Sequence, residues 1–495
     1  MLTTYHEFAG FGGDTIGVLA VPGTRGVLAA NHDENAILTH ALNHPEMDHY
    51  RGDIAKEDIG RFPRVDFFAA TPSCPPWTDA RGEKRDFDNT TQGVLFDPVT
   101  GPRASNPQTA RARALMEEIP RYLQAMNRRG KPVLGGLVEN VVQVVKWDQF
   151  GRWRREIEAE GYRTRVIALN AMHVTGPTLG KVAQSRNRFL FAYWHTSLGR
   201  DPDWDKWLRP KAYCPVCDEV VSAVQVFKEP RVTMGVYGAR NGQYVYRCPH
   251  RACRHQIVEP EVLPASTVID WSLDPGQRIG QRVDKHGRPD PLTPATIERI
   301  EAGLARHAGT LLVSCAARAG VHTATSVGQP LRTQTCRRET AVVVPPFISI
   351  QRNGGSAKTA YPVDGPIPTV SAGGNHHGLV GPPTDPDGLA LLMSYYGNGG
   401  TRGTDQPVGT LTTRDRYALL TGTPPVARCT FRMLQPHEVG AGMGFPPGYR
   451  IPATVAKSKR KTVRGYGNAL PPAMAEVTAS AVIEAITGEP LEPAT

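Results

Sequence analysis

The chain has 495 residues, enough for two to four domains at roughly 100–200 residues each, and its net charge of +10 favours a polyanionic partner. Hydrophobic residues make up 40% and charged residues 21%, which is typical of a globular protein. No apolar run approaches the ~20 residues that span a bilayer, and the N-terminus lacks the pattern of a signal peptide. We therefore expect a cytoplasmic protein, monomeric and without contact to a membrane.

Residues 1 to about 195 alternate strand-like and helix-like segments, the pattern of a doubly wound, mostly parallel sheet. The expected strands are Val27–Ala30, Val65–Ala70, Leu134–Glu139, Val166–Leu169 and Arg188–Tyr193. The expected helices between them include Arg111–Met126 and Trp153–Glu160. Ligands of such sheets bind at the carboxyl ends of the strands, so we expect the catalytic and binding residues in the loops there.

A glycine-rich turn follows the first strand-like segment. It reads Phe8-Ala9-Gly10-Phe11-Gly12-Gly13. Glycine lacks a Cβ, so it permits positive φ and lets the backbone approach a ligand closely. A cofactor loop of the nucleotide-binding kind and an ordinary tight turn both explain this segment.

Cys74 stands in an unusual loop, Ala70-Thr71-Pro72-Ser73-Cys74-Pro75-Pro76, directly after a buried strand. Its three prolines fix the local backbone. A cysteine in a rigid loop at a strand end is well placed to act as a nucleophile. The alternative is a buried structural cysteine, which is the commoner fate of this residue.

Two further segments place charged residues at strand ends. Gly136–Val141 is a buried strand that ends in Glu139, an acid that is costly there unless it is used, paired or serving as a helix cap. Gln184-Ser185-Arg186-Asn187-Arg188 precedes an apolar strand, and alternation puts both arginines on one face. Two arginines that project together would bind a phosphate or a carbonyl oxygen, and a solvated edge strand is the alternative.

Four cysteines in the middle of the chain form two close pairs. Cys214 and Cys217 are separated by two residues, and Cys248 and Cys253 by four. In a reducing compartment, two such pairs predict a tetrahedral structural zinc site. Because the second pair is widely spaced, His250 or His255 is an alternative to one of the thiolates, and four unrelated thiols are the remaining alternative.

Residues 311–420 contain a repeat in three copies, with many Gly and Pro residues. Each copy begins with a short apolar strand, at Leu311–Ser314, Phe347–Ile350 and Leu391–Ser394. Each continues through a Pro-x-x-Thr segment and closes with a second strand, at Ala341–Val344, Gly378–Val380 and Ala418–Leu420. The spacing predicts three stacked β-hairpin units.

The last 70 residues return to a helical pattern, with helices expected at Pro436–Met443 and Ala473–Ile486, the second amphipathic. The segment Lys457–Lys461 is the densest basic patch, and a phosphate contact and a solvated loop explain it equally well. Gly467-Asn468-Ala469 stands just before the last helix, where an asparagine is often only a helix cap.

Together, in this order, the motifs resemble those of the DNA cytosine-5 methyltransferase family over residues 1 to about 195 and 428 to 487. The resemblance rests on the turn Phe8–Gly13, on Pro72–Cys74, Glu139–Val141 and Gln184–Arg188, on the segment from Arg432 to Pro446, and on Gly467–Ala469. It implies a Rossmann-like α/β domain that binds S-adenosylmethionine, with a large, mainly β target-recognition domain inserted before the last motifs. The implied domains are 1–198, 199–425 and 426–495, with a zinc segment at 212–256.

The resemblance also implies roles for individual residues. Cys74 would be the covalent nucleophile, with Glu139, Arg188 and Arg186 holding a cytosine base that has flipped out of double-stranded DNA. The residues implied to contact the cofactor are Phe8, Gly10, Gly12, Gly13, Asp33, Asp53 and Asn468. The implied reaction is transfer of a methyl group to carbon 5 of cytosine.

The chain departs from the family pattern near both ligands. Ser73 and Pro75 stand where the family has a proline and a glutamine. The acid that holds the cofactor ribose aligns with Asn31, and Asp33 is the neighbouring candidate for that role. These departures leave open a different donor or an RNA substrate, and a silent DNA-binding homologue is a further alternative. Zinc-dependent deamination is disfavoured, because no His/Cys cluster accompanies Cys74 in the sequence.

Overall fold

The computed structural model describes residues 1–72, 107–263 and 435–494, together with short stretches and strand backbones between 264 and 434. Residues 107–114 and the strands between 311 and 433 are described by their backbone alone. Cys74 lies outside the described residues. The chain forms two compact units, of which the first is Met1–Leu263 with Pro368–Gly374 and Pro436–Thr495, and the second is Pro264–Ile367 with Asn375–Gln435. This division differs from the expected boundary at residue 199, because the four-cysteine segment falls in the first unit.

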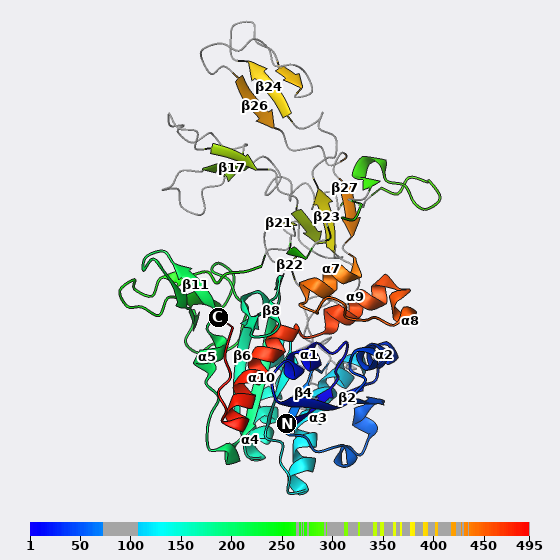
Figure 1. Cartoon of the computed structure of the whole chain (residues 1–495), viewed down its shortest axis with the longest axis vertical. Coiled ribbons are helices and arrows are strands. Elements are labelled where there is room, and N and C mark those ends of the chain that lie inside the picture. Colours follow the sequence, from blue (N-terminus) through cyan, green and yellow to red (C-terminus); the bar gives the residue numbers. More distant parts are fainter. Residues whose placement is uncertain are drawn as a thin grey trace, which may run out of the picture. The chain divides into compact units, whose positions relative to one another are not determined.

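The first unit is built on a seven-stranded sheet with the order β3-β2-β1-β4-β5-β10-β6 (Figure 1). Its strands are β1 (Leu2–Glu7), β2 (Thr24–Asn31), β3 (Asp48–Arg51), β4 (Phe67–Ala70), β5 (Gly135–Asn140), β6 (Tyr162–Asn170) and β10 (Asn187–His195). Strands β3, β2, β1, β4 and β5 pair in parallel, and β10 runs antiparallel to both β5 and β6. This parallel-dominated sheet fits the predicted α/β methyltransferase fold.

The strand order has a consequence for the site. The chain leaves β1 towards β2 and β3 on one side and returns to β4 and β5 on the other. In open α/β sheets, ligands bind at the carboxyl ends of the strands where the order reverses in this way. The loops after β1 and β4 begin at that point, and they are the glycine-rich turn and the loop that contains Cys74. Because β10 is antiparallel, its amino end, next to Arg188, lies at the same edge.

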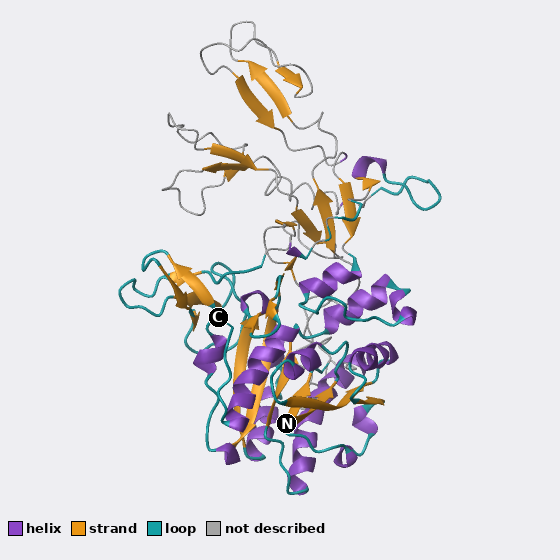
Figure 2. Cartoon of the chain, viewed as in Figure 1, coloured by secondary structure: helices purple, strands orange, loops and turns teal. Residues whose placement is uncertain are grey.

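Helices cover both faces of this sheet (Figure 2). They are α1 (Gly13–Leu19), α2 (Glu34–Asn43), α3 (Pro107–Arg128), α4 (Phe150–Ala159), α5 (Trp204–Leu208), α7 (Pro436–Gly442), α8 (Ala453–Ala456), α9 (Lys459–Asn468) and α10 (Pro472–Thr487). Two apolar cores result. One packs α3 and α4 against aromatic residues of the sheet, and the other packs α10 against the opposite face.

The prediction that the last helix is amphipathic is wrong. Nearly every side chain of α10 is buried, because the helix lies between the sheet and α1, α5 and the short strand β7 (Thr175–Gly176). The stretch Lys459–Thr487 has the length and composition of a membrane span, but 94% of its apolar window is buried inside the protein. That burial is what a core helix shows.

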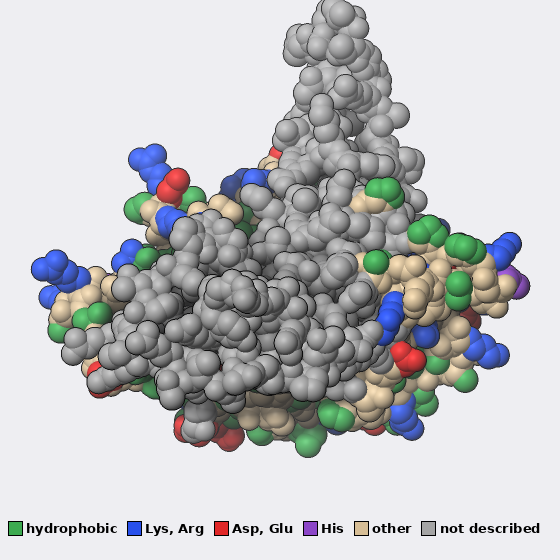
Figure 3. Space-filling view, turned by 90° about the horizontal axis from the view of Figure 1, so that it is seen from above, with side chains coloured by type: hydrophobic (Ala, Val, Ile, Leu, Met, Phe, Trp, Pro, Cys, Tyr) green, Lys and Arg blue, Asp and Glu red, His purple; other side chains and the backbone are tan. Residues whose placement is uncertain are grey.

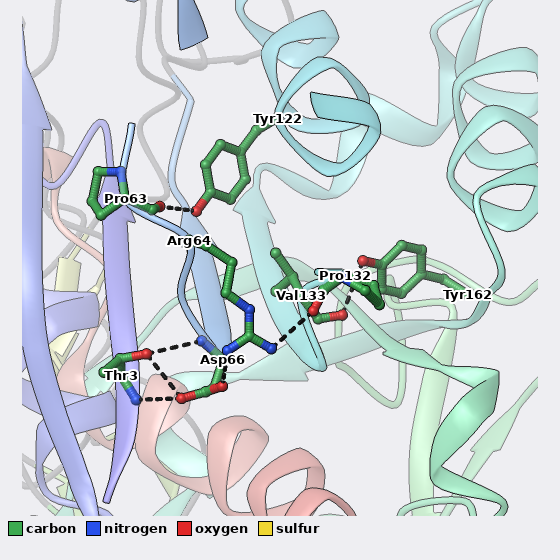
Figure 4. Close-up of polar contacts among 8 residues, drawn as sticks. All are labelled: Thr3, Pro63, Arg64, Asp66, Tyr122, Pro132, Val133 and Tyr162. Atoms are coloured by element: carbon green, nitrogen blue, oxygen red, sulfur yellow. Dashed lines mark hydrogen bonds and ion pairs between the residues drawn. The ribbon is translucent and has the colours of Figure 1, made fainter. Parts of the chain in front are cut away.

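A set of polar contacts ties the sheet together at its other edge, where the parallel strands begin. Figure 4 shows the residues involved, which are Thr3, Pro63, Arg64, Asp66, Tyr122, Pro132, Val133 and Tyr162. The backbone N–H and hydroxyl of Thr3 donate to Asp66 at 2.9 and 2.8 Å, and Arg64 ion-pairs with Asp66. Arg64 also donates to the carbonyl oxygen of Pro132. These bonds join the starts of β1, β4 and β5, at the edge opposite the glycine-rich turn.

Residues 211–261 of the first unit, here called the cysteine ribbon, form two small antiparallel sheets. The first pairs β11 (Lys211–Cys214) with β12 (Glu219–Ser222). The second is β13 (Val224–Phe227), β14 (Tyr244–Arg247) and β15 (Ile257–Val258). The buried ribbon side chains join the same apolar core as α3, α4 and the sheet. The ribbon therefore folds against the seven-stranded sheet.

The second unit contains short strands, and those of residues 311–421 pair in three similar sets. The strands are β16 (Gln277–Arg278), β17 (Leu311–Ser314), β18 (Thr325–Ser326), β19 (Thr340–Val343), β20 (Phe347–Ile350), β21 (Ala360–Pro362), β23 (His377–Gly381), β24 (Ala390–Ser394), β25 (Thr401–Gly403), β26 (Tyr417–Thr421) and β27 (Thr430–Met433). In each copy the opening strand pairs antiparallel with the closing strand, as predicted: β17 with β19, β20 with β23, and β24 with β26. A third short strand also pairs with the opening strand in every copy, so each unit has three strands, one more than the predicted hairpin.

Candidate active site

The glycine-rich turn after β1 has the backbone of a ligand-binding loop. Phe8, Gly10 and Gly12 all have positive φ, at 60, 56 and 80°. Such a conformation is strained for phenylalanine, and strain of this kind concentrates at functional sites. At Gly12 a Cβ atom would lie 3.0 Å from the ring of His40, so a larger residue would not fit without displacing it. The four predicted cofactor residues of this turn therefore lie in one tightly curved segment.

This turn packs against the final motif, although the two are more than 450 residues apart in the chain. A Cβ on Gly13 would lie 2.0 Å from the carbonyl oxygen of Leu470. The ring of Phe11 contacts that of Tyr466 edge-on at 5.5 Å, and the hydroxyl of Tyr449 donates to the carbonyl oxygen of Phe11. The structure thus brings together the two segments that were predicted to hold the cofactor.

The polar residues predicted to hold the cofactor have differing surroundings. Asp33 caps α2 by accepting a hydrogen bond from the N–H of Ala36, and its own N–H donates to Asn31. Asp53 follows the carboxyl end of β3. The backbone N–H of the preceding Gly52 donates to the carbonyl oxygen of Asn31, which joins the carboxyl ends of β3 and β2. Asn468 is exposed and is the last residue of α9, so it does not cap the helix that follows.

The root of the Cys74 loop is fixed to the strands on both sides of β4. Thr71 donates its N–H to the carbonyl of Glu7 and its hydroxyl to the carbonyl of Phe8. The side-chain amide of Asn140 donates to the carbonyl of Pro72 at 3.3 Å. Asn140 is fully buried at the end of β5. The loop therefore starts between the glycine-rich turn and the Glu139–Asn140 pair.

Glu139 and Arg188 form a buried ion pair at this edge of the sheet. The Nε atom of Arg188 lies 2.7 Å from Oε1 of Glu139, and the side chains are 11% and 3% exposed. β10 and β5 bring them together, because Phe189 pairs with Asn140 and Leu190 with Glu139. Burial raises the pKa of Glu139, and the charge of Arg188 opposes this rise. A carboxyl group in this setting is suited to share a proton with a bound base.

Arg186 has a different partner from Arg188. Its side chain is 2% exposed, and its Nη2 atom donates to the carbonyl oxygens of Gly467 and Ala469 at 2.9 and 3.2 Å. Arg186 therefore ties the strand before β10 to the final motif. The sequence placed both arginines on one face, but the structure shows that they hold different parts of the site.

Sequence reasoning missed Glu7, which ends β1 directly before Phe8. Its side chain is fully buried, and burial, together with the nearby Glu118, raises its pKa to about 8. The hydroxyl of Tyr5 donates to Oε2 at 3.3 Å. The signal that identified Glu139, an acid at the end of a buried strand, was present here as well.

Sequence reasoning also missed a group of buried histidines beside the glycine-rich turn. His40 contacts His49 at 2.8 Å and the hydroxyl of Thr15 at 2.9 Å. His6 pairs with Asp14 at 2.8 Å, and both side chains are almost fully buried. Burial lowers the pKa of His40 and His49, so these rings are held neutral. They fill the space behind the turn.

The four predicted metal ligands converge in the cysteine ribbon. Four Sγ atoms lie within 4.8 Å of one another, those of Cys214, Cys217, Cys248 and Cys253. Each of the two cysteine pairs lies in or beside a tight turn. Sγ of Cys217 is 3.9 Å from Sγ of Cys248. In a tetrahedral site with Zn–S bonds of about 2.3 Å, sulfur atoms are about 3.8 Å apart, so the arrangement fits a zinc ion.

The two histidines that were alternatives to a thiolate have other partners. His250 lies 2.8 Å from a carboxylate oxygen of Glu219, and the ring of His255 lies 3.1 Å from the carbonyl oxygen of Cys248. Four sulfur ligands are therefore sufficient for the site.

The fold and these contacts fit an α/β methyltransferase domain. The family model described as C-5 cytosine-specific DNA methylase matches residues 3–201, the part that carries the turn, Glu139 and Arg188. Residues 3–201 therefore match the family that the motifs resemble. No curated protein matches the sequence.

Solved structures are similar to nearly the whole chain at low sequence identity. A DNA modification methyltransferase encoded within an E. coli prophage is 14% identical, with a TM-score of 0.44 over 98% of this chain and 100% of the other. The Entamoeba histolytica methyltransferase EhMeth is 9% identical, with a TM-score of 0.47 over 98% and 99%. The S. pombe Dnmt2 methyltransferase is 13% identical, with a TM-score of 0.46 over 98% and 97%.

Proposed function

We propose that the protein transfers a methyl group from S-adenosylmethionine to carbon 5 of cytosine in double-stranded DNA, through a covalent adduct with Cys74. The observation that carries this proposal is the arrangement around β4. The loop of Cys74 is rooted to Phe8, in the glycine-rich turn, and to Asn140, beside the buried Glu139–Arg188 pair. Nucleophile, acid and cofactor loop thus start from three adjacent strands of one sheet edge.

Each group on the base side has a defined task. The thiolate of Cys74 adds to carbon 6, which makes carbon 5 nucleophilic. Glu139, with its raised pKa, donates a hydrogen bond to the ring at N3 and stabilises the charge that develops there. Arg188 fixes the orientation of Glu139 and holds the base oxygen. After methylation the proton on carbon 5 leaves to solvent, and the bond between Sγ and carbon 6 breaks.

The cofactor side is built by chain segments from both ends of the sequence. Phe8, Gly10, Gly12 and Gly13 form its inner wall, and Arg186 holds the final motif against them. We assign Asp53, after β3, to the adenosine portion, with Asp33, the cap of α2, as a weaker neighbouring contact. When bound, S-adenosylmethionine would supply an electrophilic methyl group, and cleavage of its sulfonium–methyl bond would leave S-adenosylhomocysteine. The target base has to leave the duplex to reach it, because its ring faces are otherwise stacked.

Charge supports a nucleic acid as substrate. The net charge is +10, and Figure 3 shows Lys and Arg side chains spread around the described part of one face. In the basic patch, Lys457, Arg460 and Lys461 are exposed, and the last two lie in the first turn of α9. Cations there oppose the helix dipole, so stability does not explain them, whereas a phosphate contact does. We propose that residues of the second unit, with its three β repeats, read the target sequence.

The test is product analysis with the purified full-length protein. S-adenosylmethionine labelled in its methyl group is incubated with mixed-sequence duplex DNA and, separately, with RNA of the same sequence. We expect label in 5-methyldeoxycytidine, and none with Cys74→Ser. Label confined to RNA would overturn the DNA substrate, and no label in either polymer would overturn the methyl transfer itself.

We also propose that the four cysteines of the ribbon hold one structural zinc ion. Their mutual distances fit four sulfur ligands, and the ribbon is too small to build a full core alone. Metal analysis of the purified protein is expected to give one zinc per chain, with none in Cys217→Ser. A wild-type protein without zinc, refolded in the presence of zinc and still without it, would contradict this assignment.

A further inference from the structure

The cysteine ribbon contacts the strands that build the base side of the active site. β6 is the edge strand of the catalytic sheet, and the side-chain amide of Gln225, on β13, donates to the carbonyl of Ala168 on β6 at 2.8 Å. The backbone N–H of Tyr237 donates to Oδ1 of Asn187 at 3.0 Å. The ribbon thus bonds to both of the last two strands of the sheet.

Aromatic packing supports the same contact. His173, in the short helical turn after β6, is 5% exposed. The rings of Tyr237 and Tyr246 meet its ring edge-on, with centroids 4.3 and 5.2 Å away. Burial lowers the pKa of His173 to about 3, so the ring packs here as a neutral group. The interface between ribbon and sheet is therefore apolar, with a few directed hydrogen bonds.

Asn187 stands between Arg186 and Arg188 in the chain. Its Oδ1 atom accepts from Tyr237 of the ribbon and, at 3.1 Å, from the side-chain amide of Asn170. Asn170 in turn accepts a bond from the backbone N–H of Arg186 at 2.9 Å. The carbonyl of Asn187 accepts from Nη1 of Arg188 at 2.9 Å. One ribbon N–H therefore enters a network that holds the backbone next to both arginines.

We propose that the cysteine ribbon, closed by its metal ion, is a positioning element that holds the strand Gln184–Arg188 in its active geometry through Asn187. The metal has no part in the chemistry on this account. It keeps the two turns of the ribbon together, so that Tyr237 and Gln225 stay against the sheet. The inference rests on the proposed methyl transfer and on the zinc assignment, and it gives the metal a measurable effect on Arg188 and Glu139.

The test uses two changes that break the network at different points. Cys217→Ser removes a metal ligand, and Asn187→Leu removes the acceptor while the four cysteines stay intact. Two matched controls accompany them. His250→Gln alters the ribbon next to the metal site without removing a ligand, and Asn187→Asp keeps an oxygen acceptor for both Tyr237 and Asn170.

Three quantities are measured on each full-length protein: zinc content, amide hydrogen exchange of the peptide that covers residues 184–190, and the steady-state constants. Cys217→Ser and Asn187→Leu are expected to speed exchange at Arg186 and to lower kcat by at least ~10-fold, as small misplacements of catalytic groups do. KM for S-adenosylmethionine is expected to rise by less than the roughly tenfold loss of affinity expected for Arg186→Lys, because the side chain of Arg186 stays in place. Asn187→Leu is expected to keep its zinc. Both controls are expected to behave as wild type.

The outcomes separate the positioning role of the ribbon from the proposed methyl transfer. Unchanged exchange at residues 184–190 in the zinc-free variant would overturn the positioning role, whatever the activity. Faster exchange there in a protein that never methylates cytosine would keep the positioning role and refute the proposed function. A loss of kcat in Asn187→Asp equal to that of Asn187→Leu would also contradict the proposal, because the acceptor would then not matter.

Discussion

The two halves of the catalytic sheet, on either side of the junction between β1 and β4, carry their charges in different ways. In the base half, Glu139 and Arg188 pair directly, and Asn140 bonds to the root of the Cys74 loop. In the cofactor half, Asp33 caps a helix, Asn31 stands where the family has an acid, and the buried groups are Glu7 and histidines. The base half thus keeps Cys74, Glu139 and Arg188 of the motif set, although Ser73 and Pro75 differ beside the cysteine, and the cofactor half departs from the pattern at Asn31.

The difference follows from the chemistry each half serves. Addition to cytosine and stabilisation of its developing charge need particular groups at fixed positions, so few substitutions are tolerated there. Adenosine can be held by backbone atoms and by acids at several strand ends, so one contact can be replaced by another. The comparison predicts large effects on kcat from the base half, and effects on affinity or stability from the cofactor half.

Glu139→Gln tests the base half most severely. The amide cannot supply the proton that the raised pKa of Glu139 makes available, so we expect kcat to fall by about 10²- to 10⁴-fold. Binding of S-adenosylmethionine, measured by calorimetry, is expected to change little. A Glu139→Gln protein that loses cofactor affinity and keeps kcat would contradict the separate roles of the two halves.

Glu7→Gln tests the cofactor half through stability. The pKa of Glu7 is about 8 in the folded protein against 4.5 as its ordinary value, so the folded state holds a proton that the unfolded chain releases. The contribution of protonated Glu7 to the free energy of unfolding is complete below pH 4.5 and is lost as the pH rises towards 8.

Glutamine cannot ionise, so Glu7→Gln is expected to gain stability relative to wild type across that pH range, by on the order of a few kcal/mol at its upper end. Chemical denaturation at a series of pH values measures this gain. Glu34→Gln, which alters an exposed ion pair with Arg51, is the control and is expected to show no such trend. A flat difference between wild type and Glu7→Gln would contradict the raised pKa.

Arg186→Lys and Arg188→Lys separate the two arginines. Lysine cannot reach both carbonyls of the final motif, so Arg186→Lys is expected to weaken S-adenosylmethionine binding by about tenfold. Arg188→Lys is expected to lower kcat and to leave cofactor affinity unchanged. Calorimetry and steady-state kinetics on both variants check this. Identical behaviour of the two variants would show that the arginines act on one ligand.

Asp33→Asn is expected to have the smallest effect. Asparagine caps helices as well as aspartate does, so the capping bond to Ala36 is retained, and we expect S-adenosylmethionine affinity to change less than about threefold. Asp53→Asn is the comparison, with an expected loss of about tenfold if the acid contacts adenine. Equal losses in both variants would assign the ribose contact to Asp33 after all.

The sequence was sufficient for local features and for the order of the elements. The strands at residues 27–30, 134–139 and 188–193 and the helix at 111–126 were predicted because their apolar periodicity is strong. The repeat strands of the second unit were predicted for the same reason, and their pairing agrees. The cysteine spacing predicted the convergence of four sulfur atoms, because few other arrangements bring two such pairs together in a reducing compartment.

What the sequence could not predict is the choice of partner over long distances. Arg186 binds carbonyls 281 and 283 residues away, and alternation along its own strand says nothing about them. The burial of α10 on all sides depends on α1 and α5, so its own pattern misled the prediction. The ribbon was assigned by its position in the chain to the inserted domain, but its packing on Asn187 and Ala168 is set by tertiary contacts.

The central claim, covalent catalysis by Cys74 on cytosine, is tested most directly with duplex DNA that contains 5-fluorocytosine. Fluorine at carbon 5 blocks release after methylation, so the account predicts a protein–DNA adduct that resists denaturation and carries the methyl label of S-adenosylmethionine. Cys74→Ser should form none. If the wild-type protein binds this DNA and S-adenosylmethionine without forming an adduct, the covalent mechanism is refuted.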